Sequence, residues 1–367
     1  MKFIIPIAKP LIDHNETKAV NKAISSGWIT MGRKVEEFEK KICALTKSKY
    51  SVAVNNGTSA LDAILKALSI GPGDEVIVPS LTYISTANVV LYNGAKLILC
   101  DNDPDTFNVT VKNIEKKITK KTKAFITVDL KGTPVDYEKF KKLSIKHKIY
   151  YISDSAESFG AKYKKKFIGT QADIHSFSFF ANKNITTGEG GAITTNNKKI
   201  YEKLKIIRNQ GQDKRYNHVV LGNNYRMTDL CASIGITQLK KINRIIQQKN
   251  KLAKIYTKEL KKNKNITPPF IPDYATQPSW YMYSIKVKKK FRNKLINFLK
   301  KNKIDTRLSF PPVHIQPYYV KKFKFKRSQF VNAINSYDSF VDIPIWYGMK
   351  KKTQYYIIKK LNAFFKK

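Results

Sequence analysis

Short apolar runs suited to strands alternate with helical patterns through the first two thirds of this chain, and this alternation restricts its fold more than any other feature. Leu61, Ile64 and Leu68, for example, recur at the spacing of one helix face. Strands that alternate with helices form βαβ units, whose strands join a largely parallel sheet covered by the helices. We therefore predict an α/β fold with a large, mixed but mostly parallel sheet.

The order of the expected elements indicates two parts. The expected strands lie at 51–55, 75–78, 96–100, 123–128, 149–153, 174–178 and 191–195. The expected helices lie at 11–26, 34–46, 59–69, 83–92, 111–118 and 136–147, and a long one runs from near 228 to about 260. A proline cluster at 268–272 then marks a change of pattern. With 367 residues there is room for two domains. We predict a large domain over 1–250, including an N-terminal segment, and a smaller C-terminal α/β domain over 251–367.

The formal net charge is +42 at pH 7, and the excess is lysine, since the chain has 61 lysines and eight arginines. A strongly basic chain can bind nucleic acid or an anionic membrane surface. Here the lysines are spread over the whole length, with no basic arm, RNA-binding aromatic signature or helix-turn-helix pattern. We therefore expect a solvated lysine-rich surface, which would help to recruit a nucleotide diphosphate, and no nucleic acid partner.

Other global features favour a cytoplasmic protein. No apolar run reaches the roughly 20 residues of a membrane-spanning helix, and the first residues do not resemble a secretory signal. Cys43, Cys100 and Cys231 are scattered along the chain. They suit buried thiols in a reducing compartment and form neither a disulfide framework nor a zinc pattern. We expect no membrane span and no metal site.

The stretch from Ser176 to Gly191 carries the strongest chemical signal. A single lysine, Lys183, lies there among hydroxyl-bearing and small residues, ahead of a glycine-rich turn. The strand expected at 149–153 delivers Asp154 upstream of it. Pyridoxal phosphate (PLP) needs both groups: a lysine amine to form an imine with its aldehyde, and an aspartate to keep its pyridine nitrogen protonated. We predict that Lys183 and Asp154 are the catalytic residues of a PLP enzyme.

Together with further segments, this stretch resembles the DegT–DnrJ–StrS family of sugar aminotransferases. The segments that carry the resemblance are Gly27-Trp28-Ile29-Thr30, Val35-Glu36-Glu37-Phe38-Glu39, Asn55-Asn56-Gly57-Thr58-Ser59-Ala60-Leu61, Gly71 to Pro79 with Thr82-Tyr83, and Asn223-Asn224-Tyr225-Arg226-Met227-Thr228. They keep the family's order and spacing over roughly residues 5 to 320. The resemblance implies a fold-type I, aspartate-aminotransferase-like PLP enzyme, with the cofactor in the large domain, and a homodimer with composite active sites.

Several further residues are expected to bind the cofactor. Gly57 and Thr58 lie between a strand and a helix, where backbone N–H groups bind phosphate well, although many α/β proteins have such a turn. Ser178 is near enough to the lysine to reach the same phosphate, or is an ordinary strand serine. By resemblance, Tyr83 stacks on the PLP ring and Glu157 approaches the cofactor's 3-oxygen. Since a carboxylate beside a phenolate shares a proton, a raised pKa is expected for Glu157.

The resemblance also implies contacts with substrate and partner. Asn224 is expected to reach the PLP phosphate of the partner subunit. Arg226 is expected to brace the same loop, or to bind that phosphate or the substrate, and His314 matches a family histidine near the sugar site. Relatives usually carry histidine where this chain has Asp129, at the carboxyl edge of the sheet, so this residue is expected to alter substrate preference. Glu189 is expected to brace the glycine-rich turn.

These features predict an aminotransferase, because family members that act as dehydratases replace the lysine by histidine and this chain retains Lys183. The family implies L-glutamate as donor and a nucleotide-linked 4-keto-6-deoxy sugar as acceptor, closest to GDP-4-keto-6-deoxymannose, for surface polysaccharide synthesis. One alternative is amination of a dTDP- or UDP-linked 3-keto sugar, and another is a basic nucleic acid-binding or regulatory protein on a PLP fold. Because most arginines fall outside the motif loops, we expect no arginine in the pocket that is dedicated to a dicarboxylate acceptor.

Overall fold

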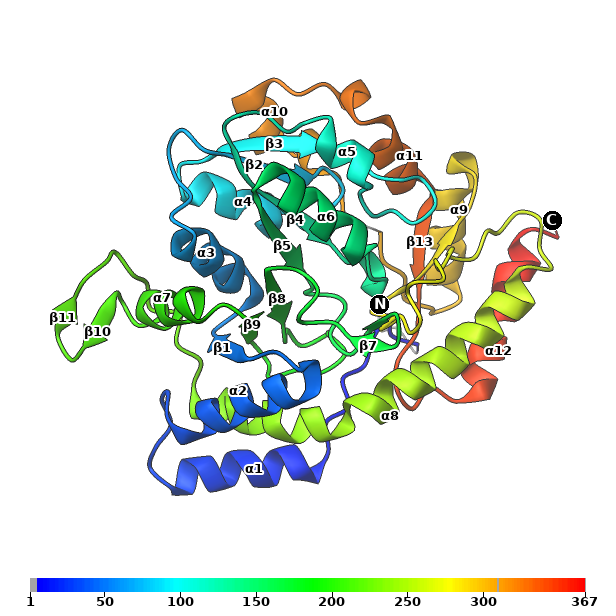
Figure 1. The fold of residues 1–367 in the computed structure, drawn as a ribbon. Coiled ribbons are helices and arrows are strands. Elements are labelled where there is room, and N and C mark those ends of the chain that lie inside the picture. The colour runs from blue at the N-terminus through cyan, green and yellow to red at the C-terminus, as the bar shows by residue number, and fades with distance from the viewer. Residues whose placement is uncertain (1–4, 309, 367) are drawn as a thin grey trace.

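A seven-stranded sheet forms the centre of the structure, a computed structural model that describes residues 5–308 and 310–366. Helices cover both faces of this sheet (Figure 1). Its strand order is β1-β9-β8-β5-β4-β2-β3. The strands are β1 Tyr50–Val54, β2 Glu75–Pro79, β3 Lys96–Cys100, β4 Thr122–Val128, β5 Tyr150–Asp154, β8 Ile174–Ser178 and β9 Gly191–Thr195.

The sheet is mixed but mostly parallel, as predicted. Parallel pairing joins β8, β5, β4, β2 and β3, while β9 is antiparallel to both β1 and β8. Every residue of β2 is buried, because helices exclude water from both faces of its strands. Successive side chains point to opposite faces, so Val76 and Val78 join one hydrophobic cluster and Ile77 joins the other.

The helices of the large part follow the expected order, with differences at their ends. They are α1 His14–Ser25, α2 Arg33–Thr46, α3 Gly57–Ala67, α4 Ser85–Tyr92, α5 Val111–Glu115, α6 Tyr137–His147, α7 Lys198–Arg208 and α8 Asp229–Leu260. Helix α3 begins two residues before the expected start because Asn56 caps it, its side chain accepting a hydrogen bond from the Ser59 N–H at 2.8 Å. This start places Gly57 in the first turn.

The C-terminal part has its own strand pair and core. Its elements are β12 Tyr283–Lys286, α9 Lys289–Lys301, α10 Pro317–Phe323, α11 Val331–Ser339, β13 Phe340–Ile343 and α12 Lys351–Phe364. Its core cluster contains Leu295, Val341 and Ile357 and also takes in Ile5, from the other end of the chain. Helix α8 continues without a break through residue 250, packing on α1 and α2 and also on α12 (Figure 1). The domain division at residue 250 therefore stays a prediction.

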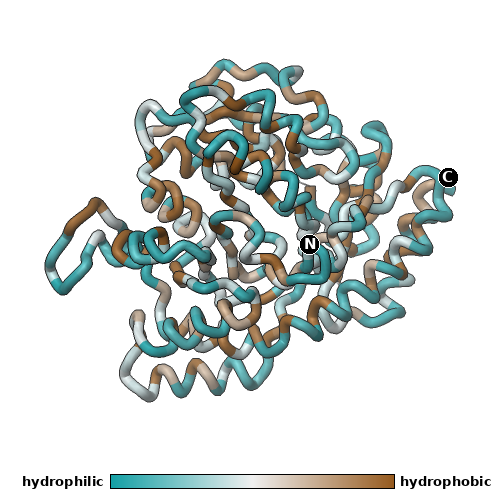
Figure 2. The backbone as a smooth tube through the Cα atoms, in the orientation of Figure 1, coloured by the Kyte–Doolittle hydropathy of each residue, from teal (hydrophilic) through white to brown (hydrophobic). Residues whose placement is uncertain are grey.

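Two short strand pairs were not expected from the sequence. They are β6 Lys162–Tyr163 with β7 Lys166–Phe167, and β10 Gln212–Lys214 with β11 Asn217–His218. Short 3-10 helices lie at Leu130–Gly132, Val313–Ile315 and Arg327–Gln329. The β10–β11 hairpin projects from the body of the molecule and carries an apolar stretch (Figures 1 and 2). Tyr216 and Leu221 are 77% and 89% exposed there.

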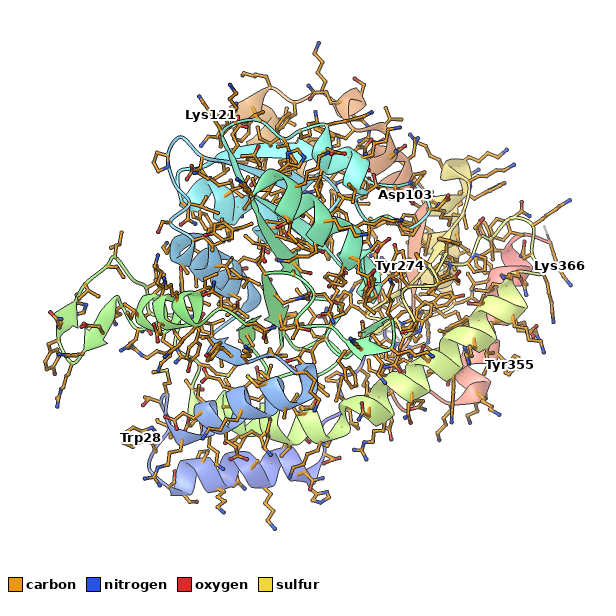
Figure 3. All side chains as sticks on the ribbon, in the orientation of Figure 1. Trp28, Asp103, Lys121, Tyr274, Tyr355 and Lys366 are labelled. Carbon is orange, nitrogen blue, oxygen red and sulfur yellow. The ribbon has the colours of Figure 1, made fainter. Side chains whose placement is uncertain are left out.

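Lysine side chains lie at widely separated places on the surface. Long side chains project along the whole outline, with Lys121 and Lys366 on widely separated margins (Figure 3). The lysines are therefore not confined to one margin of the molecule (Figure 3). Within the described ranges, no helix combines the length and the hydropathy that crossing a bilayer requires.

Candidate active site

A cavity of about 610 Å³ opens where the parallel strands end. Val128, Asp154 and Ser178, the last residues of β4, β5 and β8, all line it. Carboxyl ends of parallel strands meet at one edge of a sheet, which is where open α/β folds bind ligands. Seven residues predicted from the sequence line this cavity: Gly57, Thr58, Tyr83, Asp154, Glu157, Ser178 and Lys183.

Lys183 lies in the loop between β8 and β9. This loop turns back on itself, since the Lys183 N–H donates to the Phe180 carbonyl at 2.9 Å. The Lys183 Nζ lies 4.2 Å from the centroid of the Tyr281 ring and 4.0 Å from Glu157 Oε1. Burial lowers the pKa of Lys183, against the opposing effect of the nearby Glu157. A lowered pKa leaves more of the uncharged amine, which is the form that attacks an aldehyde.

Asp154 lies at the floor of the cavity and is 5% exposed. Its Oδ2 accepts a hydrogen bond from Thr86 Oγ1 at 2.8 Å, and its Oδ1 accepts one from the Ala156 N–H at 3.2 Å. Burial raises the pKa of Asp154, and these two hydrogen bonds oppose the rise. A carboxylate has about four acceptor sites, so Asp154 keeps capacity for a further donor. It therefore fits the pyridinium N–H of PLP.

Glu157 has one bonded and one unbonded oxygen. Its Oε2 accepts a hydrogen bond from the Lys131 N–H at 2.7 Å. Its Oε1 is buried and has no hydrogen-bond partner among the described residues. A buried polar atom without a partner costs free energy, which a ligand group can recover. Burial raises the pKa of Glu157, the direction expected from the sequence. The residue therefore fits the phenolic oxygen of PLP, with which it would share a proton.

The first turn of α3 forms the phosphate end of the cavity. The Asn56 side chain and carbonyl occupy the N–H groups of Ser59 and Ala60, so the N–H groups of Gly57 and Thr58 remain for a ligand. A Cβ at Gly57 would lie 2.9 Å from the Cβ of Ser178, so glycine lets strand β8 approach the helix end. Helix N-termini bind phosphate through such N–H groups and the helix dipole. The residues present therefore fit the cofactor phosphate.

Aromatic rings form the remaining wall. Tyr83 is 55% exposed and packs edge-on against Phe310, with 5.3 Å between the ring centroids. Phe310 and Tyr281 also line the cavity, and neither was identified from the sequence. Both come from the C-terminal part of the chain, outside the motifs. The stacking of Tyr83 on the cofactor ring stays a prediction.

Arg307 lines the cavity and was not identified from the sequence. The expectation that the pocket lacks an arginine dedicated to a dicarboxylate acceptor stays a prediction. Its backbone pairs with Asp342 of β13 through N–H···O bonds of 3.2 and 3.0 Å. Within the described part of the chain, no residue forms an ion pair or side-chain hydrogen bond with its guanidinium. Sequence analysis missed this residue because it lies between motifs. Its closeness in the sequence to Pro311 and His314, the segment that resembles the family near the sugar site, is the one signal that could have indicated it.

His314 lies outside the cavity, despite its expected place near the sugar site. It is 0% exposed, its Nδ1 lies 2.6 Å from Ser80 Oγ, and its ring packs against Phe330. These contacts join the 3-10 helix Val313–Ile315 to the end of β2. They leave His314 no face for a substrate, so the structure gives no support to a direct role.

Asp129 also lies outside the cavity, at the sheet edge but pointing away from it. It is 0% exposed and accepts hydrogen bonds from Tyr137 Oη, Ser158 Oγ and the Val135 N–H at 2.6, 2.6 and 3.0 Å. Burial raises its pKa to about 6. The expected effect on substrate preference therefore has no direct contact to support it, because the carboxylate is used to hold the chain behind the site.

Arg226 and Asn224 do not line the cavity, although their loop pairs with the end of β1, where the Asn55 N–H donates to the Tyr225 carbonyl at 2.9 Å. The Arg226 Nη1 donates to Asn209 Oδ1 at 2.7 Å, and Asn209 pairs with Asn224 in a β-bridge. These contacts are those of a brace, the role favoured for Arg226. The contact of Asn224 with a partner's cofactor stays a prediction. Glu189 lines the cavity, and the turn is braced by its backbone, whose carbonyl accepts from Thr187 Oγ1 at 2.5 Å.

The chain is similar in sequence to known sugar aminotransferases, whose cofactor fits the cavity described above. A model of the DegT/DnrJ/EryC1/StrS aminotransferase family matches residues 10–362. The GDP-perosamine synthase of Escherichia coli O157:H7 is 38% identical over 369 residues, 100% of this chain and 99% of that protein. That of Caulobacter vibrioides is 40% identical over 322 residues, 86% of each chain.

The chain is also similar in structure to a solved sugar aminotransferase. The putative sugar aminotransferase Spr1654 of Streptococcus pneumoniae, in its PLP form, has a TM-score of 0.92 at 30% identity over 98% of both chains. These matches confirm the predicted fold, cofactor and reaction class, which is that of a PLP-dependent sugar aminotransferase. The chain belongs to the DegT/DnrJ/EryC1/StrS aminotransferase family.

Proposed function

We propose that the protein transfers the amino group of L-glutamate to C4 of a GDP-linked 4-keto-6-deoxy sugar of the mannose type. The observation that carries the reaction is the grouping of a buried lysine amine with two buried carboxyl groups and a helix N-terminus in one cavity. The choice of sugar is supported by the relatives named GDP-perosamine synthase, at 38% and 40% identity. The product would serve the synthesis of surface polysaccharide.

Each residue has a defined task in this reaction. PLP, when bound, supplies an electron sink that acidifies the carbon bearing the transferred nitrogen. Lys183 Nζ takes the proton from that carbon and returns it. Asp154 keeps the ring nitrogen protonated, and Glu157 holds the ring oxygen. Gly57 and Thr58 bind the phosphate. The side chain of Lys183 is 14% exposed, so little water competes for the proton.

Arg307 supports a dicarboxylate donor. Its guanidinium stands at the cavity and is near enough to Lys183 to lower the lysine's pKa. An arginine binds a carboxylate through two parallel hydrogen bonds, which fixes its orientation as well as its position. Held in this way, the α-carboxylate of glutamate would set its α-carbon beside the Lys183 amine. The diphosphate of the sugar nucleotide would find its charge partners among the surface lysines.

A homodimer is the assembly that we propose. Trp28 is 60% exposed at one margin of the molecule (Figure 3), and Ile29 is 47% exposed beside it. The β10–β11 hairpin adds the exposed Tyr216 and Leu221. Clustered exposed apolar side chains are typical of protein interfaces. In such a dimer, Asn224 would be the residue that reaches the cofactor phosphate of the partner subunit. An active monomer in sedimentation at assay concentration would contradict this.

The free cysteines suit a reducing compartment, and we propose the cytoplasm.

The test of the function is an assay of GDP-, dTDP- and UDP-linked 3-keto and 4-keto sugars with L-glutamate as donor. We expect that only the GDP-linked 4-keto sugar is converted. Mass spectrometry detects the amino sugar that is formed. Conversion of only a 3-keto sugar would contradict the position, and conversion of only a simple 2-oxo acid would contradict a sugar acceptor.

A further inference from the structure

Lys249 of α8 is a buried lysine with no acidic partner in the described part of the chain. It is 5% exposed, and its Nζ makes one hydrogen bond there, to Asn184 Oδ1 at 2.7 Å. Lys241, two turns earlier on α8 and equally buried, instead lies 2.6 Å from Glu16. Burying an amine without a counter-charge costs free energy. Accordingly, burial lowers the pKa of Lys249 to about 7.

The partner of this amine is the residue next to the catalytic lysine. Asn184 follows Lys183, and its Nδ2 donates to the Ser279 carbonyl at 3.1 Å. On the other side, Asn182 Oδ1 accepts from Tyr281 Oη at 3.2 Å. Two amides therefore attach the lysine loop to the segment 279–281. The ring of Tyr281 is the one that lies against the catalytic Nζ.

Helix α8 holds this segment a second time. Asn250 Oδ1 accepts from Trp280 Nε1 at 3.0 Å, and its Nδ2 donates to the Pro278 carbonyl at 3.3 Å. The Ser279 N–H donates in turn to the Gly132 carbonyl at 2.9 Å. The lysine loop, the segment 278–281 and two consecutive residues of α8 thus form one hydrogen-bonded unit behind the reactive amine.

We propose that Lys249 is a positioning residue for Lys183, which holds Asn184 so that the catalytic amine points at the cofactor aldehyde. It acts through Asn184 and contacts neither cofactor nor substrate. Methionine or leucine would fill the same space without the cost of a buried amine. A costly group directly behind a reactive one is typical of sites where stability is given up for function. The proposal rests on the proposed role of Lys183.

The experiment measures imine formation directly and does not depend on turnover. Full-length protein freed of cofactor is mixed with PLP, and the imine is fixed with borohydride at timed intervals and located by peptide mass. We expect Lys249→Met to slow labelling of Lys183 by about tenfold or more, because small displacements of a reacting group cost large rate factors. Lys249→Gln, whose amide N–H can still donate to Asn184, is expected to restore most of the rate.

A second measurement distinguishes a role of Lys249 in positioning Lys183 from a role in stabilising the fold. The unfolding temperature of Lys249→Met is expected to equal or exceed that of the wild type, because the unpaired buried amine is gone. Lys241→Met is the matched control on the same helix. It leaves Glu16 buried without its partner, so it is expected to lower the unfolding temperature and to leave the labelling rate unchanged.

Three results would overturn the proposal. The first is a wild-type labelling rate in Lys249→Met, and the second is slower labelling together with a lower unfolding temperature, as a structural support would give. The third is additivity with Asn184→Ala, since residues that act through one another give a double variant no slower than the slower single one. Labelling of a residue other than Lys183 in the wild-type protein would instead refute the proposed function itself.

Discussion

Two buried carboxyl groups, Glu157 at the cavity and Asp129 behind it, differ in the number of hydrogen bonds that they accept from the protein. Asp129, behind the cavity, accepts three hydrogen bonds from the protein, two of them from Tyr137 and Ser158. Glu157, within it, accepts one, and its other oxygen is unbonded among the described residues. Both are buried and both have a raised pKa. The difference therefore lies in bonding capacity, which is kept where a ligand is to be bound.

Basic residues show the same difference between groups bonded within the fold and groups left unbonded at the cavity. The guanidinium of Arg208 is bound to Glu39 and to the Ala53 carbonyl, so its charge is used inside the fold. Lys183 and Arg307 face the cavity without a comparable partner among the described residues. Bonding within the fold thus indicates which substitutions should reduce stability and which should reduce activity. The predictions below test this division, from the largest expected effect to the smallest.

Lys183→Ala is expected to reduce amino transfer by about four orders of magnitude or more, because both the imine-forming amine and the proton carrier are removed. Among the described residues, the side chain makes only the long contacts with Glu157 and the Tyr281 ring, so the unfolding temperature without cofactor should stay close to that of the wild type. Single-turnover assays and thermal unfolding measure the two effects. A variant with residual activity near the wild type would place the reactive amine elsewhere.

Asp154→Asn is expected to reduce activity by about two orders of magnitude while PLP still binds. The amide cannot stabilise a protonated ring nitrogen, so the electron sink weakens. The phosphate contacts at α3 are untouched, and equilibrium dialysis should give a cofactor affinity within about tenfold of the wild type. Loss of binding together with activity would mean that Asp154 mainly holds the cofactor in place.

Arg307→Gln is expected to slow the half-reaction with L-glutamate by about tenfold to a hundredfold, the value of a charge-assisted hydrogen-bonded pair. The half-reaction with the sugar nucleotide should change by less than about threefold. Rapid-mixing absorbance of each half-reaction separates the two. Arg244→Gln is the control, since Arg244 contacts Asp13 at the surface, 3.8 Å away. An equal loss in both half-reactions would contradict a donor-specific role.

The sequence predicted the strands of the sheet because they depend on local pattern, and Asp154 and Ser178 end parallel strands, which meet at one edge. The places of Tyr83 and Glu157 at the cavity came instead from the family resemblance. Arg307 could not be found in this way, because it is brought to the cavity by long-range pairing of its backbone with Asp342. His314 shows the converse, because a residue assigned to the site by the family resemblance is buried in contacts within the fold.

The orientation of Asp129 could not be predicted either, because a strand end fixes where the backbone lies and not which donors the next side chain meets. Residues such as Tyr137 reach it from the following helix. The domain division at residue 250 stays a prediction for a similar reason, since local pattern does not show which distant segments pack together. Helix α8 carries no break at residue 250, and Ile5 packs with C-terminal residues that are remote in the sequence.

Asp129→Asn provides the smallest and most discriminating test, because the sequence suggested an effect on substrate preference and the structure points to stability. We expect kcat and KM for both substrates to stay within about twofold. At pH 7 the free energy of unfolding should fall by about 1 kcal/mol, since an amide cannot accept all the donors that meet the carboxylate.

The pH dependence of this loss follows from the raised pKa of Asp129. Between pH 3.8 and about 6 the folded protein binds the Asp129 proton more readily than the unfolded chain. The part of the stability that comes from this proton binding is therefore fully present below pH 3.8 and is lost as the pH rises through about 6, while the hydrogen bonds to the carboxylate remain at pH 7. Asparagine does not titrate, so the wild type should exceed the variant by more at pH 4 than at pH 7. Denaturant unfolding at both pH values measures this difference. A difference that grows toward pH 7, or a changed preference among keto sugars, would place Asp129 with the residues that face the ligand.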